Sequence, residues 1–193
     1  MILALASLIP IFLVVMEVTI VLSRREVAGI LLIAGQLANE GFNLVLKEIV
    51  QQERPHMHLG DGYGMPSSHS QFMTFFVTFT VVYLETHITT NAIHKRAVQA
   101  GAIALGLLVM VSRVYLGYHT TLQVIAGGIV GICSGCVWLW LVERAIYASK
   151  FVDIVLDWPV CKWLLIRDSR NVQDIALAEY KLSRHAASSF KTK

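Results

Sequence analysis

Charged side chains are scarce in this chain. Only 15% of its 193 residues are Asp, Glu, Lys or Arg, whereas a soluble domain of this size carries about a quarter. The mean hydropathy is +0.61, and several apolar runs reach the length of about 18 residues that indicates a membrane span. An ordinary soluble domain is therefore excluded. The formal net charge of +3 is small, and no run of Lys and Arg suggests a nucleic-acid partner.

Cysteine is also rare, which limits metal and disulfide chemistry. Cys133 and Cys136 form a C-x2-C pair inside an apolar run, and Cys161 is the third cysteine. Since a zinc site needs about four ligands, we interpret all three as small buried apolar residues and predict no metal site. Residues 1–22 are apolar but lack a basic amino-terminal region and a clear cleavage site, so we expect a retained span.

The apolar runs predict an all-α, polytopic transmembrane bundle of about five spans. The predicted spans cover approximately residues 2–22, 27–50, 68–87, 97–116 and 122–142. The stretch 151–166 is apolar but interrupted by Asp153, Asp157 and Pro159, so an interfacial segment is expected there. A basic tail, partly helical at best, follows from Arg167. We accordingly divide the chain into a membrane-embedded domain, residues 1–150, and an interfacial segment with a cytosolic tail, residues 151–193.

Lys and Arg residues are divided unequally between the two predicted faces. Five spans place thirteen of the sixteen on the face that carries the tail, and the positive-inside rule makes this face cytosolic. The other three are Lys47, Arg54 and Arg113, which fall on the lumenal or exoplasmic face.

A polar stripe marks the second predicted span. Its members follow helical spacing and share one face: Gln36, Asn39, Glu40, Asn43 and Lys47. We interpret the three amides as a structural seam between helices. Arg54 lies on the same face if the helix continues to Pro55. The glycines of the fifth span are typical of close helix packing: Gly127, Gly128, Gly131 and Gly135.

Three motifs meet on the lumenal face. The first motif is K-x6-RP (Lys47–Pro55), the second is PSSH (Pro66–His69), and the third is SR-x5-H (Ser112–His119). Lys supplies a point charge and Arg a planar fork for phosphate oxygens, while the second motif opens a helix whose N–H groups favour an anion. Two histidines can serve as nucleophile and acid. The motifs therefore predict a phosphate-transfer site.

Together the motifs resemble the signature of the type 2 phosphatidic acid phosphatase superfamily, K-x6-RP, P-S-G-H and S-R-x5-H-x3-D. This resemblance implies that His119 attacks phosphorus, that His69 protonates the leaving group, and that neither a metal nor another cofactor is needed. It also implies a set of phosphate-binding residues: Lys47, Arg54, Ser67, Ser68 and Arg113.

Two positions depart from that signature. Ser68 replaces Gly, and Gln123 replaces the Asp that orients and charges the nucleophilic imidazole. An amide can hold the ring by a hydrogen bond but cannot offset the charge of an imidazolium. Glu40, Asp61 and a substrate phosphate are the candidates for that charge. The chain also has one predicted span before the first motif, where the superfamily usually has two.

Longer strings narrow the resemblance. Residues 39–55, 63–73 and 112–124 resemble the dolichyl-diphosphatase branch, which also carries Gln in the third motif. The resemblance implies removal of the terminal phosphate of dolichyl diphosphate through a phosphohistidine, at the lumenal face of the endoplasmic reticulum membrane, in carrier recycling for protein N-glycosylation. The alternatives are a phosphatase for phosphatidate, lysophosphatidate, a sphingoid-base phosphate or undecaprenyl diphosphate, a catalytically silent lipid-binding scaffold, or a lipid-phosphate transporter.

Overall fold

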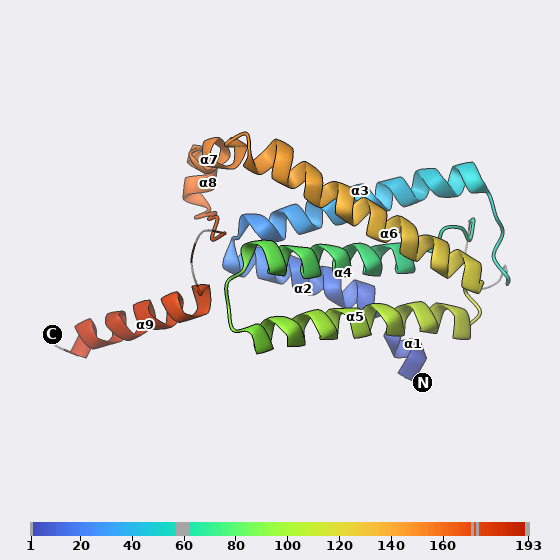
Figure 1. Ribbon diagram of the computed structural model, residues 1–193, viewed down its shortest axis with the longest axis horizontal. Helices are drawn as coiled ribbons and strands as arrows, with labels where there is room; N and C mark the ends of the chain where they lie inside the picture. The colour runs from blue at the N-terminus through green and yellow to red at the C-terminus, as the bar shows by residue number, and fades with distance from the viewer. Residues whose placement is uncertain (1, 57–61, 171, 173, 192–193) are drawn as a thin grey trace.

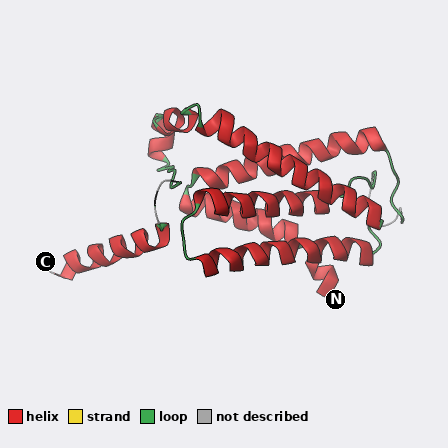
Figure 2. Cartoon of the chain, viewed as in Figure 1, coloured by secondary structure: helices red, strands yellow, loops and turns green. Residues whose placement is uncertain are grey.

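Five long helices run back and forth along one axis (Figure 1). The structure, a computed structural model, describes residues 2–56, 62–170, 172 and 174–191. The long helices are α2 (Ile9–Arg24), α3 (Val27–Val50), α4 (Ser68–His87), α5 (Ala92–Tyr115) and α6 (Thr121–Leu141). Among the described residues there is no strand, only an isolated bridge between Glu26 and Arg167 (Figure 2). The predicted all-α bundle is confirmed.

Three of these helices are long and apolar enough to cross a membrane. They are α3, α5, and α6 together with the π-helical turn η2 (Val142–Tyr147) that continues it. The first predicted span is instead divided, since α1 (Ile2–Ala6) is separated from the 16-residue α2 by a turn before Pro10. Helix α4 has 20 residues but carries Ser, Thr, Gln and His side chains. The count of five spans therefore stays a prediction.

Helix α4 lies at the centre and packs against α6, α5, α3 and α2. Its fully buried Phe75 belongs to one apolar cluster with Phe79 and Leu139, and its fully buried Met73 belongs to another with Val109 of α5. Because these side chains are buried on different sides of the helix, they fix its rotation within the bundle.

Glycines let α6 approach α4 closely, as the sequence predicts. A Cβ on Gly131 would lie 2.0 Å from Thr74 Oγ1, and one on Gly127 would lie 2.5 Å from the backbone oxygen of Ser67. Neither position leaves room for a side chain. The contact at Gly127 seats the start of α6, and with it the end of the third motif, against the start of α4.

A buried hydrogen-bond network joins α3, α4 and α6 beneath the second motif. Asn43 Nδ2 donates to Gln71 Oε1 at 2.7 Å and to the Pro66 carbonyl at 3.4 Å. Gln71 Nε2 donates to Asn39 Oδ1 at 2.9 Å, and Ser134 Oγ donates to the same oxygen at 2.7 Å. The predicted structural seam is confirmed for Asn39 and Asn43. Because the network holds Pro66, it also fixes where the second motif begins.

The predicted end of the second span at residue 50 is confirmed, but two related expectations are wrong. Helix α3 ends at Val50, where Gln51 adopts the left-handed conformation (φ 50°), so Arg54 is not a helical residue of the polar stripe. Helix α5 starts at Ala92, earlier than expected, because the Asn91 side chain caps it by accepting from the Ile93 N–H.

The cysteine prediction is also partly wrong. Cys133 and Cys136 are exposed on the outer surface of α6, and only Cys161 is buried.

The end of the bundle opposite the motifs carries α7 (Phe151–Leu156), α8 (Pro159–Trp163) and α9 (Ile175–Lys191), which extends away from it (Figure 1). The expected interruption of 151–166 is therefore confirmed as two short helices. Arg167 pairs with Glu26 at 2.7 Å and with Glu179 at 2.9 Å, and so joins the tail to the start of α3. The interfacial position of this segment and the division of the chain at residue 150 stay predictions.

Candidate active site

The three motifs converge at one end of the bundle (Figure 1). Lys47 lies in the last turn of α3 and Arg113 in the last turn of α5, while His69 lies in the first turn of α4 and His119 just before α6. Successive long helices alternate in direction, so these ends meet at the same side. The structure therefore brings the predicted histidines and cationic residues together.

Arg54 reaches the site by a different route from the one predicted. After the left-handed turn at Gln51 the chain leaves the helix axis, and Arg54 Nη1 comes to 3.4 Å from His119 Nε2. Its Nε donates to the Gly62 carbonyl at 3.3 Å. The guanidinium is thus placed beside the ring nitrogen that would attack phosphorus.

A backbone carbonyl orients His119. The Nδ1 atom lies 2.9 Å from the Gly64 carbonyl oxygen and 3.3 Å from Gln123 Oε1. Both oxygens are acceptors, so Nδ1 carries the proton and Nε2 keeps its lone pair. That lone pair faces Arg54.

Burial keeps the His119 imidazole neutral. The residue is 2% exposed, and burial together with the charges of Arg54 and Arg113 lowers the pKa of His119 to about 4. A neutral imidazole is the form that can act as a nucleophile.

Of the two carboxylates considered as a charge partner of His119, only Glu40 can be placed, and it does not contact the ring. Asp61 lies outside the described residues. Glu40 lies instead beside Lys47 and lines a groove with Ser68 and His69. Neutral oxygens, those of Gly64 and Gln123, occupy the position that an acidic partner would take.

The serines of the second motif have different surroundings. Lys47 Nζ donates to Ser68 Oγ at 3.5 Å, at the mouth of the site. Ser67 is fully buried, and its N–H donates to the Gln123 carbonyl at 3.1 Å. Ser67 therefore joins the second and third motifs, and its direct contact with a phosphate stays a prediction.

Arg113 holds a buried donor that lacks an acceptor. Its guanidinium stacks on the Tyr118 ring at 3.8 Å, and its carbonyl accepts from the N–H groups of Tyr118 and His119. Within the described part of the chain, Arg113 Nε has no hydrogen-bond partner. Burying such a donor unpaired is costly, so this arrangement favours an anionic ligand.

The other cations of the site also form no close ion pair with the described residues. Among the described residues, every ion pair lies outside the three motifs. His69 lies within the electrostatic influence of all three cations, Lys47, Arg54 and Arg113. The charge of Arg54 also repels the charges of Lys47 and Arg113. Three positive charges that repel one another at one place are balanced when a phosphate or diphosphate binds.

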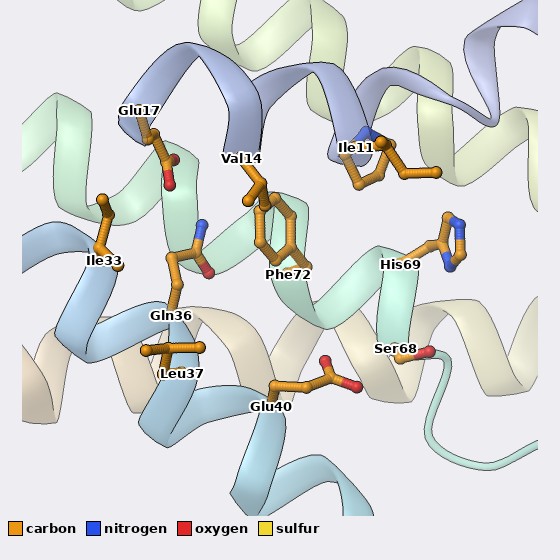
Figure 3. A pocket seen from close by; sticks show the side chains of 11 residues that line it. Ile11, Val14, Glu17, Ile33, Gln36, Leu37, Glu40, Ser68, His69 and Phe72 are labelled. Atoms are coloured by element: carbon orange, nitrogen blue, oxygen red, sulfur yellow. The ribbon is translucent and has the colours of Figure 1, made fainter. Parts of the chain in front are cut away.

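A groove of about 340 Å³ leads from the second motif along the bundle (Figure 3). It lies between α2, α3 and α4, and its polar mouth is formed by Ser68, His69 and Glu40. Apolar side chains line its walls, and Glu17 and Gln36 lie farther along it. The lining residues are Pro10, Ile11, Val14, Glu17, Ile33, Gln36, Leu37, Glu40, Ser68, His69 and Phe72.

Two contributors escaped prediction. Gly64 acts through a carbonyl group, which every residue has, so no sequence signal marks it. Tyr118 carries a signal, an aromatic residue next to a motif histidine, but this also fits a residue at the membrane interface. The stacking on Arg113 becomes visible only in three dimensions.

The same residues occur in a known family. The sequence profile of the PAP2 superfamily matches residues 28–147, which include all three motifs. The chain is 37% identical to Dolichyldiphosphatase 1 of Homo sapiens over 96% of this chain and 82% of that protein. It is also 37% identical to Dolichyldiphosphatase 1 of Dictyostelium discoideum over 92% of this chain and 79% of that protein.

More distant proteins are also similar to this chain, one in sequence and one in fold. Lipid phosphate phosphatase gamma of Arabidopsis thaliana is 33% identical over 95% of this chain and 84% of that protein. A similar fold occurs in the crystal structure of a transmembrane PAP2 type phosphatidylglycerolphosphate phosphatase from Bacillus subtilis, with a TM-score of 0.63 and 24% identity over 75% of this chain and 76% of that one. This chain belongs to the PAP2 superfamily.

Proposed function

We propose that this chain is a membrane phosphatase that hydrolyses the terminal phosphate of dolichyl diphosphate to give dolichyl monophosphate. The observation that carries the proposal is the pairing of His119 Nε2 with Arg54, next to the buried Arg113 donor, for which the described residues supply no acceptor. A nucleophile and unpaired cations at one point fit the transfer of an anionic phosphoryl group. The names of the relatives supply the lipid.

The proposed reaction begins with attack by the lone pair of His119 Nε2 on the terminal phosphorus. A P–N bond forms while the bridging P–O bond breaks, and the leaving dolichyl monophosphate takes a proton from His69, which becomes protonated once the bound diphosphate offsets the charges of the cations around it. Lys47, Arg54 and Arg113 offset the charge on the phosphoryl oxygens. The Gly64 carbonyl holds the Nδ1 proton throughout this step.

Water completes the proposed cycle. His69, now neutral, takes a proton from a water molecule whose oxygen attacks the phosphohistidine. The P–N bond breaks, inorganic phosphate leaves, and both histidines return to their starting protonation states. The residues named here supply the charge, the nucleophile and the proton.

The groove supports a lipid substrate. Its mouth contains Ser68 and His69, and its walls are formed by apolar side chains such as Val14, Leu37 and Phe72 (Figure 3). A diphosphate held by the three motifs would thus have its first isoprenoid units beside an apolar surface. Burial of each methylene group is worth about 0.8 kcal/mol, so a short contact of this kind adds substantially to affinity.

We further infer that the protein lies in the endoplasmic reticulum membrane with its active site facing the lumen and its carboxyl-terminal tail in the cytosol. The support is the separation of charge along the bundle. In the described part of the chain, Arg24, Arg96 and Arg167 form ion pairs at the end opposite the site, and such residues face the cytosol by preference. We also propose the division of the chain into a membrane-embedded domain, residues 1–150, and an interfacial segment with a cytosolic tail, residues 151–193.

The proposal is tested with purified protein in detergent and a chelator. Phosphate release from dolichyl diphosphate is compared with release from phosphatidate, for the wild type and for His119→Ala and Arg54→Ala. We expect a preference for dolichyl diphosphate and loss of nearly all turnover in both variants, which still insert into the membrane. A strong preference for phosphatidate would instead indicate a broader lipid phosphatase, and normal activity of His119→Ala would refute the nucleophile assignment.

A further inference from the structure

The Gln123 side chain is fully buried and uses both ends of its amide. Its Nε2 donates to the Glu53 carbonyl at 2.8 Å and approaches Gln52 Oε1 at 3.4 Å. Its Oε1 accepts from the Thr120 N–H at 3.2 Å and faces His119 Nδ1 at 3.3 Å. A carboxylate of the same shape has no N–H and could make only the second half of these contacts.

Gln123 also contacts all three motifs. Its amide nitrogen binds the residue that directly precedes Arg54 of the first motif, and its backbone carbonyl accepts from the Ser67 N–H of the second. Its amide oxygen lies in the third motif, beside the nucleophile. Gly64 packs against the same amide so closely that a Cβ on it would lie 2.7 Å from Gln123 Nε2.

We propose that Gln123 is a positioning residue that holds the three motifs in register, and that the Gly64 carbonyl has taken over the orientation of His119. The proposal rests on the phosphatase function proposed above. In this arrangement the N–H end of residue 123 is the essential end, because it fixes the Glu53 carbonyl and therefore the direction in which Arg54 leaves the loop. The shorter hydrogen bond of the His119 ring, at 2.9 Å, is the one to the Gly64 carbonyl, and the side chain of residue 123 is not a partner in it.

One consequence distinguishes this role from that of the acidic residue in the superfamily signature. An Asp or Glu at position 123 would direct a carboxylate oxygen at the Glu53 carbonyl and at Gln52 Oε1, and would bury a negative charge there. Restoring the residue of the signature should therefore harm this enzyme. If the only function of position 123 were to orient and charge His119, the same change would improve it.

The test measures kcat and KM for dolichyl diphosphate with Gln123→Asp and the isosteric Gln123→Glu. We expect kcat/KM to fall by ~10- to 100-fold in both, the usual effect of losing one buried hydrogen bond and opposing another acceptor. The acid limb of the Gln123→Glu profile should also move to higher pH, because a carboxylate beside His119 favours its protonation. Turnover by Gln123→Asp at or above the wild-type rate would overturn the proposal.

Gln99→Glu is the matched control. Gln99 is also buried, at 5% exposure, and its Nε2 likewise donates to two acceptors, the Glu85 carboxylate at 3.0 Å and the Val81 carbonyl at 3.3 Å, but at the opposite end of the bundle. The same chemical change there should leave kcat, KM and the pH profile of the purified enzyme unchanged. If Gln99→Glu lost as much kcat/KM as Gln123→Glu, general destabilisation would explain both losses, and the positioning role of Gln123 would be refuted.

A second pair of variants keeps the test independent of folding defects in Gln123→Glu. Gly64→Ala adds a methyl group against Gln123 Nε2 without adding charge, and Gln123→Asn shortens the side chain away from that methyl group. We expect each single variant to lose activity and the double variant to lose less than the product of the two losses. Independent, multiplicative losses would contradict the proposal. An inactive wild type would instead refute the proposed function.

Discussion

The acid limit of the reaction depends on His119, and the structure gives its position. The pKa of an exposed histidine is 6.5, whereas burial and the charges of Arg54 and Arg113 lower the pKa of His119 to about 4. At pH 5 an ordinary histidine is about 97% protonated, while His119 stays about 90% neutral. The lower pKa makes protonation of His119 less favourable than that of an exposed histidine by about 3 kcal/mol. The free enzyme should therefore keep a competent nucleophile well below pH 6.

The assay is kcat/KM for phosphate release between pH 4 and 8, because this ratio reports groups of the free enzyme and free substrate. Arg54→Gln provides the internal comparison. Removing the nearest guanidinium raises the pKa of His119, so the acid limb of the remaining activity should shift upward. The substrate phosphate, with a second pKa of about 6, titrates identically in both assays and cancels from the difference.

The sign of the stability effect follows from the same values. Unfolded His119 binds a proton as the pH falls through 6.5, and the folded residue binds it only near 4. Acidification across this interval therefore favours the unfolded state, and the stabilising effect of a neutral His119 is fully present only above the unfolded value. A wild-type acid limb at or above pH 6.5, or an Arg54→Gln limb that does not move upward, would refute the reasoning.

Two further predictions concern packing and the lipid. Gly131→Val should lower the free energy of unfolding by about 3 kcal/mol or more, because a Cβ at position 131 would already lie 2.0 Å from Thr74 Oγ1. Thermal unfolding in detergent measures this loss. The control is Gly101→Ala, because a Cβ at position 101 meets nothing within 4 Å. Val14→Trp should fill the groove and raise KM for dolichyl diphosphate about tenfold, but raise KM less for a short-chain prenyl diphosphate. Val18→Trp, on the same helix and similarly exposed, is the control. Equal KM values in the two Trp variants, or a stable Gly131→Val protein, would contradict these predictions.

The helical bundle and the meeting of the motifs were predictable because both follow from patterns along the chain. Apolar periodicity gives the long helices, and their alternating direction places Lys47, His69 and Arg113 at one end. The amide stripe of α3 likewise identifies Asn39 and Asn43 as a seam, since amides at membrane depth need partners on neighbouring helices. Their exact partners, Gln71 and Ser134, required the structure.

The approach of Arg54 and the partner of His119 could not be predicted. Helical spacing suggested that Arg54 continued the stripe of α3, but the turn at Gln51 ends the helix and the loop returns the side chain by another path. The oxygen that orients His119 is a backbone atom of Gly64, which has no side-chain signature. Asp61, a candidate for that role, lies outside the described residues.

The central position of α4 has a consequence for how the protein is assembled in the membrane. Its Gln71 side chain depends on Asn39 and Asn43 of α3, and its Thr74 is covered by Gly131 of α6. Helix α4 thus carries polar groups that α3, which precedes it in the chain, and α6, which follows it, shield together. The packing of α4 is complete only when α6 has joined the bundle, so we expect the second and third motifs of the nascent protein to come together last.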